Sequence, residues 1–195
     1  MAMLLLKLHP MVPTRPPAGS SAGFTLVELL LVVGLIGTMA AVALPVMKDM
    51  TASIKLNDAA RMVQRELDGA RLKAVSVNRV MRVRMNCPAT GYIRRVEVVT
   101  AAVDSASNRC LDSAYPFPAA DNDIMTRPNF DGAVRALPTG ATVTTSNIQF
   151  SPDGTANEVV AGVPQAIATV VTLTITREGK SKTVTVNGIG KIQLQ

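Results

Sequence analysis

The sequence predicts an α+β fold in which one long N-terminal helix packs on antiparallel β-sheet. An apolar run at residues 24–47 passes into an amphipathic helical pattern at 48–78. From residue 79 the hydrophobic period changes to two, which is typical of half-buried strands. A helix followed by a run of strands indicates an α+β domain. We therefore divide the chain into a leader at 1–23, the two helical segments, and a β-rich globular domain at 79–195.

The segment 24–47 is long enough to span a membrane, which takes about 20 mostly apolar residues. It carries one charge, Glu28, and such an acid costs about 2.5–3.5 kcal/mol at the centre of a membrane helix. Cleavage between Gly23 and Phe24 would place a cationic α-amine about one helical turn from that acid. The Glu28 carboxylate could then pair with its own amine or with that of a neighbouring copy, and the helix dipole also favours it there.

The residues at this point, Gly-Phe-Thr-Leu-Val-Glu-Leu-Leu from Gly23, resemble the processing site of type IV pilins and type II secretion pseudopilins. The resemblance implies that residues 1–23 are a prepilin leader and that a prepilin peptidase cleaves between Gly23 and Phe24. It also implies methylation of the Phe24 amine and a role for Glu28 in assembly. Pro45 stands where the family has a helix-kinking proline, and we expect a kink there.

The resemblance also sets the expected orientation and location. Cations lie on both sides of the span, so their count does not decide its direction: Lys7, Arg15, Lys48 and Lys55. The motif places the N-terminus in the cytoplasm. It therefore implies a single-pass protein of the bacterial inner membrane, with its globular domain in the periplasm. The start codon at Met1 or at Met11 stays open, and both leave the cleavage site unchanged.

Composition argues against an enzyme. The only histidine, His9, lies in the leader, so the processed chain has no Ser–His or Cys–His pair and no histidine ligand for zinc. We therefore expect no catalytic residues, no metal and no cofactor. Aromatic residues make up only 3% of the chain, so the core must be aliphatic. The net charge of +6 is compatible with an anionic partner without requiring one.

Two cysteines, Cys87 and Cys110, fall in the globular domain. A domain outside the cytoplasmic membrane experiences oxidising conditions, where an even number of cysteines indicates a disulfide. We expect these two to pair, and two buried free thiols are the alternative.

The segment 48–78 has an apolar residue every three or four positions, as in a helix with one buried face. Asn78 is the expected helix stop. The expected buried stripe is Leu56, Ala59, Val63, Leu67, Ala70, Ala74 and Val77. Charged residues occupy the other faces: Lys55, Asp58, Arg61, Arg65, Asp68 and Arg71.

A strand at 81–87, a turn at 88–91 and a strand at 92–100 predict a hairpin. Four arginines would lie close together on it: Arg82, Arg84, Arg94 and Arg95. Such a group either binds phosphates or forms a solvated strand face that protects an edge.

Residues 101–141 have no sustained periodicity, and their prolines and aspartates predict a long loop. Asp121 and Asp123 have a spacing seen in calcium loops, but the glycine and distal glutamate of such a loop are missing. We expect a solvated loop, the kind of segment that often carries partner specificity.

The remaining chain predicts further strands at 142–150, 168–176, 181–187 and 191–194. A tight turn is expected at 151–154, and Glu178 and Gly179 read as a two-residue hairpin loop. The residues expected to point inward are Val171, Leu173, Ile175, Val184 and Val186.

Two stretches here, Ile-Gln-Phe-Ser-Pro-Asp-Gly-Thr-Ala at 148–156 and Val-Asn-Gly-Ile-Gly-Lys-Ile at 186–192, resemble GspH/FimT-type minor pilins and pseudopilins. The resemblance implies the pilin fold. It also implies a minor subunit that helps initiate or cap a fibre of other pilin or pseudopilin subunits, in a type IV pilus or a type II secretion system.

The same resemblance allows an alternative, a DNA-binding minor pilin that acts in DNA uptake. The basic residues that would bind DNA are Arg177, Lys180, Lys182 and Lys191. An ordinary polar turn is the other interpretation of these residues.

Overall fold

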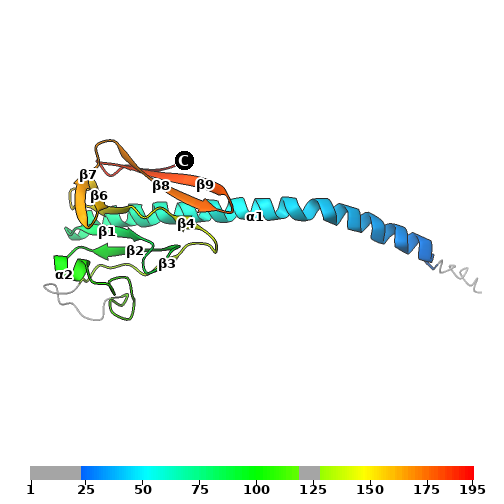
Figure 1. Cartoon of the computed structure of the whole chain (residues 1–195), viewed down its shortest axis with the longest axis horizontal. Helices are drawn as coiled ribbons and strands as arrows, with labels where there is room; N and C mark the ends of the chain where they lie inside the picture. Colours follow the sequence, from blue (N-terminus) through cyan, green and yellow to red (C-terminus); the bar gives the residue numbers. More distant parts are fainter. Residues whose placement is uncertain (1–22, 119–127) are drawn as a thin grey trace, which may run out of the picture. The chain divides into compact units, whose positions relative to one another are not determined.

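A computed structural model describes residues 23–118 and 128–195 (Figure 1). The chain divides into two compact units, Met1–Leu44 and Pro45–Gln195, and each is described by itself. The long helix α1 (Leu26–Val77) begins in the first unit and ends in the second. A four-residue helix, α2 (Ala101–Asp104), lies in the second unit.

Thr25 caps the start of α1. Its hydroxyl accepts a hydrogen bond from the Glu28 backbone N–H at 3.2 Å, and its carbonyl accepts one from the Leu29 N–H at 3.1 Å. A threonine followed three residues later by a glutamate has the spacing of a capping box, which satisfies N–H groups that the first turn leaves free. The motif residues therefore also start the helix.

In the second unit, α1 buries one stripe of small and aliphatic side chains. This stripe contains the predicted residues except Val77, which is half-buried, and it also includes Ala52 and Ala60. The helix ends at Val77, and Asn78 adopts the expected left-handed conformation with φ of 53°. The buried residues are Ala52, Leu56, Ala59, Ala60, Val63, Leu67, Ala70 and Ala74.

Two antiparallel sheets share a core with this part of α1 (Figure 1), as the predicted α+β fold requires. The six-stranded sheet has the order β3-β2-β1-β5-β6-β7, and the four-stranded sheet has the order β10-β9-β8-β4. The strands of the first are β1 (Met81–Met85), β2 (Tyr92–Glu97), β3 (Arg135–Ala136), β5 (Asn147–Phe150), β6 (Ala156–Val160) and β7 (Val163–Ala166). Those of the second are β4 (Thr142–Val143), β8 (Val170–Arg177), β9 (Lys180–Asn187) and β10 (Ile192–Leu194).

The β8–β9 hairpin has the predicted register. Glu178 and Gly179 form its two-residue loop with φ of 50° and 75°, the positive values that a tight right-twisted hairpin needs. Four of the predicted inward residues are buried: Leu173, Ile175, Val184 and Val186. The fifth, Val171, is partly buried against the core.

One strand prediction was wrong, and one hairpin was not predicted. Residues 142–150 form two strands in different sheets, because β4 pairs with β8 whereas β5 pairs with β1 and β6. The hairpin of β6 and β7 was missed. Its loop is Ala161–Gly162, and Ala161 has φ of 50°, a conformation that alanine rarely adopts and that its sequence does not signal.

Arg71 ties α1 to two turns of the β domain, although its place on the polar face of the helix suggested a solvent-facing side chain. Its Nε donates to the Gly154 carbonyl at 3.1 Å, and its Nη2 donates to the Ile189 carbonyl at 3.2 Å. Gly190 lies against the same side chain and has φ of +75°. A β-carbon there would approach Gly154 O to 2.2 Å.

We expect Gly190→Ala to lower the free energy of unfolding by more than about 2 kcal/mol, since it adds this steric clash to a left-handed backbone. Gly162→Ala is the matched control. Gly162 has φ of +84° with nothing within 4 Å, so only the backbone cost of about 1 kcal/mol applies. Urea unfolding of the full chain in detergent, followed by circular dichroism, compares the two. Equal losses would contradict the steric role of Gly190.

Candidate assembly site

The part of α1 in the first unit presents apolar side chains on every face. Leu26 is 75% exposed, and Phe24, which lies two residues before the helix, is 80% exposed. Among the described residues, α1 is the one helix long and apolar enough to cross a membrane. An apolar surface of this extent requires a cover, either lipid or protein.

Glu28 is the acid of this segment and lies in the first turn of α1. Gly23 and Phe24 directly precede the helix, and both are exposed. Cleavage between them, and pairing of Glu28 with the amine of a neighbour, remain predictions. Pro45 lies inside α1, and the kink predicted there also remains a prediction.

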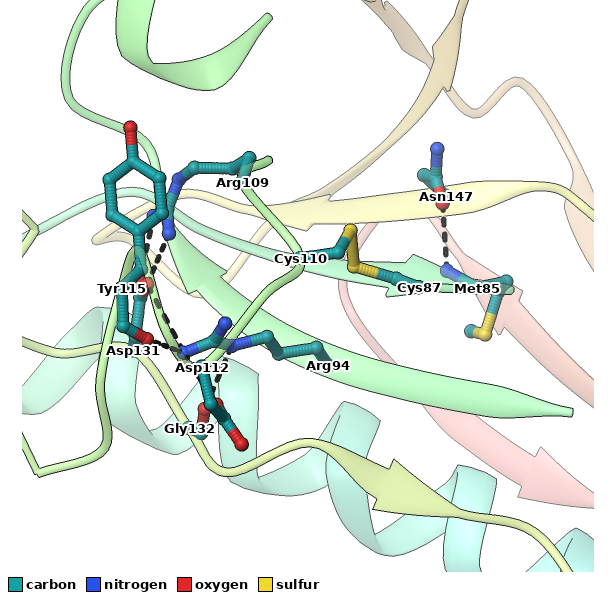
Figure 2. Close-up of a disulfide and its surroundings, with 10 residues drawn as sticks. All are labelled: Met85, Cys87, Arg94, Arg109, Cys110, Asp112, Tyr115, Asp131, Gly132 and Asn147. Carbon is teal, nitrogen blue, oxygen red and sulfur yellow. Dashed lines mark hydrogen bonds and ion pairs between the residues drawn. A yellow bond between two sulfur atoms is a disulfide. The ribbon is translucent and has the colours of Figure 1, made fainter. Parts of the chain in front are cut away.

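Cys87 and Cys110 form the predicted disulfide, with Cα atoms 5.2 Å apart. It joins the end of β1 to a loop that covers the outer face of the β1–β2 hairpin (Figure 2). We call residues 98–118 and 128–134 the covering loop. The segment predicted to be a solvated loop is therefore partly packed on the sheet. Asp121 and Asp123 lie outside the described residues.

The four hairpin arginines do not form one cluster. Arg95 faces α1 and contacts Glu66 at 4.0 Å, whereas Arg94 is fully buried under the covering loop. Arg94 donates to the carbonyls of Gly132 and Tyr115 and pairs with Asp112 (Figure 2). Burial lowers the pKa of its guanidinium, and Asp131 and Asp112 oppose that effect. The prediction of a solvated strand face or a phosphate site is thus wrong for Arg94.

Arg109 in the covering loop is the second fully buried arginine. It donates to both carboxylate oxygens of Asp131 and, at 2.9 Å, to the Glu97 carbonyl. Its guanidinium also lies 4.6 Å from the centre of the Tyr115 ring. Asp131 in turn accepts from the Glu97 N–H at 2.8 Å. This buried ion network fixes the covering loop to β2, and no local pattern in the sequence signals it.

The chain matches the family model described as type II transport protein GspH over residues 59–190, more than half of its length. The chain belongs to the GspH family. The match begins at Ala59 and so excludes the segment Gly23–Leu30. The family assignment and the processing motif are therefore independent observations.

Solved structures similar to this GspH-family chain are a minor pilin and a minor pseudopilin. FimU, a type IV minor pilin of Pseudomonas aeruginosa, is 16% identical, with a TM-score of 0.46 over 75% of this chain and 92% of FimU. EpsH, a minor pseudopilin of the type 2 secretion system of Vibrio cholerae, is 16% identical, with a TM-score of 0.43 over 72% of this chain and 96% of EpsH. None of the curated proteins matches the sequence.

The four basic residues suggested for DNA binding are spread along the GspH-family domain. Arg177 is buried and donates to the Thr139 carbonyl at 3.0 Å. Lys180 bonds Ser53 Oγ at 3.2 Å and pairs with Asp49 at 3.5 Å. Lys182 is half-buried. Lys191 follows the opposite end of β9, a strand that spans roughly 25 Å, so these side chains do not form one patch.

Proposed function

We propose that this GspH-family protein is a minor pilin or pseudopilin subunit of a type IV pilus or a type II secretion pseudopilus. A prepilin peptidase removes residues 1–23 and leaves Phe24 as a methylated N-terminus. The segment 24–47 holds the subunit in the inner membrane, with its globular domain in the periplasm. The subunit then leaves the bilayer, and the same segment packs among the helices of neighbouring subunits.

The observation that carries this proposal is the exposed apolar N-terminal part of α1, with one acid in its first turn. Lipid covers the apolar side chains before assembly, and neighbouring helices cover them afterwards. The acid is costly in either environment unless it is paired. The amine of Phe24 in a neighbouring subunit is a suitable partner, and pairing with it fixes the axial register between two subunits.

Mass spectrometry of the protein isolated from its native membrane tests the processing step. We expect an N-terminal peptide that begins at Phe24 and carries a methyl group on its amine. Protein from cells that lack the prepilin peptidase is the control, and it should keep its leader. An intact leader in cells with an active peptidase would contradict the proposal.

A further inference from the structure

Two arginines of β1, Arg82 and Arg84, lack a carboxylate partner. The Nε and Nη2 of Arg82 both donate to one amide oxygen, Gln149 Oε1, at 3.2 and 2.8 Å. Among the described residues the Arg84 side chain makes no hydrogen bond or ion pair, and its Nη1 is buried. Burial lowers the pKa of the Arg84 guanidinium, as do the neighbouring charges of Arg82 and Arg109, and the Asp104 carboxylate opposes that effect. Within the described part of the chain, Asp104 is the one carboxylate that acts on both Arg82 and Arg84, so this face of β1 has more positive than negative charge.

A cleft of about 500 Å³ opens over this part of β1. Arg82 and Gln149 provide its polar groups on the sheet, and the Asp104 carboxylate is also part of its lining. One wall is the covering loop at Val98–Ser105, and the other is the tip of the β6–β7 hairpin at Ala161–Pro164. Val163, in the second wall, is 59% exposed. The cleft thus combines an arginine on its floor with walls that are mainly apolar.

We propose that this cleft binds an extended peptide segment of a partner protein, with one carboxylate side chain reaching Arg82 and apolar neighbours lying on the two walls. The fork of a guanidinium matches a carboxylate, and Arg84 adds to the attraction from two residues further along the strand. The apolar walls favour a peptide over a small free dicarboxylate, because the small anion would leave them exposed to water.

Addition of a strand at the adjacent edge is a weaker alternative. The strand β7 forms the edge of the six-stranded sheet, but its second residue is Pro164, which has no N–H to donate. Recognition at this end of the domain therefore rests on side chains in the cleft.

The partly buried guanidinium of Arg84 also allows binding to be distinguished from a structural role. Its buried Nη1 has no hydrogen-bond partner among the described residues, and an unsatisfied buried donor lowers stability. Replacement of an arginine that only supports the fold would lower the melting temperature. Replacement of Arg84 by glutamine should leave the melting temperature unchanged or raise it, while it weakens binding of the acidic segment.

Fluorescence anisotropy with the full chain in detergent micelles tests the proposal. The probe is a dye-labelled Thr-Val-Glu-Val-Thr pentapeptide with blocked ends, and its matched control has glutamine in place of glutamate. We expect the acidic peptide to bind at least about tenfold more tightly, since a hydrogen bond to a charged group contributes at least that factor. Arg82→Gln should remove this preference and Arg84→Gln should reduce it. Arg135→Gln, an exposed arginine on β3, should not change it.

A second variant leaves both arginines in place. Val163→Glu puts a competing carboxylate on the exposed rim and should weaken binding without loss of folding, as judged by circular dichroism. Equal binding of the two peptides, or an unchanged preference in Arg82→Gln and Val163→Glu, would overturn the proposal. Displacement of the peptide by equal concentrations of succinate or inorganic phosphate would overturn the peptide assignment. Each result is independent of leader processing and fibre assembly.

Discussion

Replacing Asp131 with alanine is expected to lower the free energy of unfolding by about 3–5 kcal/mol, the usual cost of removing one partner from a buried ion pair. Asp131 is only 6% exposed and holds three groups in place. It accepts from Arg109 through both oxygens, accepts from the Glu97 N–H, and lies 3.9 Å from Arg94. Without it, two buried cations lose their nearest buried acid. Urea unfolding followed by far-UV circular dichroism suits a chain that has no Trp.

Asp112→Ala is the matched control, because Asp112 is a surface carboxylate that also pairs with Arg94. Asp112 pairs with Arg94 at 3.3 Å, but its side chain is 58% exposed. Exposed pairs contribute about 0–1 kcal/mol, so this variant should lose no more than that. A loss for Asp131→Ala as small as that for Asp112→Ala would show that the buried network does not hold the covering loop.

Glu28→Ala should leave the precursor in the membrane at normal amounts but reduce its incorporation into the fibre at least about tenfold. The expectation rests on the proposed pairing of Glu28 with the Phe24 amine of a neighbour. Removing one partner from a charge pair in a low-dielectric environment costs several kcal/mol. Each 1.4 kcal/mol of lost binding free energy corresponds to about a factor of ten in the equilibrium constant. The variant keeps the backbone N–H that bonds Thr25, so the helix cap survives. Immunoblots of membrane and sheared-fibre fractions measure both quantities.

Thr25→Ala provides the opposite control. It removes the capping hydroxyl, at a cost of about 1 kcal/mol to the end of the helix, and keeps the charge of Glu28. This variant should be incorporated nearly normally. Normal incorporation of Glu28→Ala would contradict the proposed role of the acid, and failure of both variants would indicate that the first turn of α1 matters more than its charge.

The sequence predicted those elements whose signals are local. The buried stripe of α1 repeats every three or four residues up to Ala74, and Asn78 ends the helix as expected. The β8–β9 hairpin combines alternating Thr and aliphatic residues with a glycine in its loop. The disulfide followed from the expected compartment and the number of cysteines. For the helix and the hairpin, the residues that determine the structure lie close together in the sequence. For the disulfide, two cysteines allow only one intramolecular pairing.

The predictions failed where distant residues decide the structure. The residues from Thr142 to Phe150 all suit a strand, and only pairing with β8 on one side and β1 on the other divides them. Arg94 and Arg95 are neighbours in a strand and must point to opposite faces, but the sequence does not show what covers each face. Arg95 contacts Glu66 on α1, whereas Arg94 is buried by acids and carbonyls of a loop without periodicity. The cleft over Arg82 likewise requires two walls that lie more than fifty residues apart in the sequence.

The alanine-rich stripe of α1 has a mechanical consequence. In the fibre proposed above, tension along α1 would act parallel to the row of buried residues from Ala52 to Ala74. Such a force would act in shear on all contacts of the buried stripe at once, so these contacts would not open one after another. Arg71, which holds two turns near the far end of the stripe, would resist the last part of such sliding.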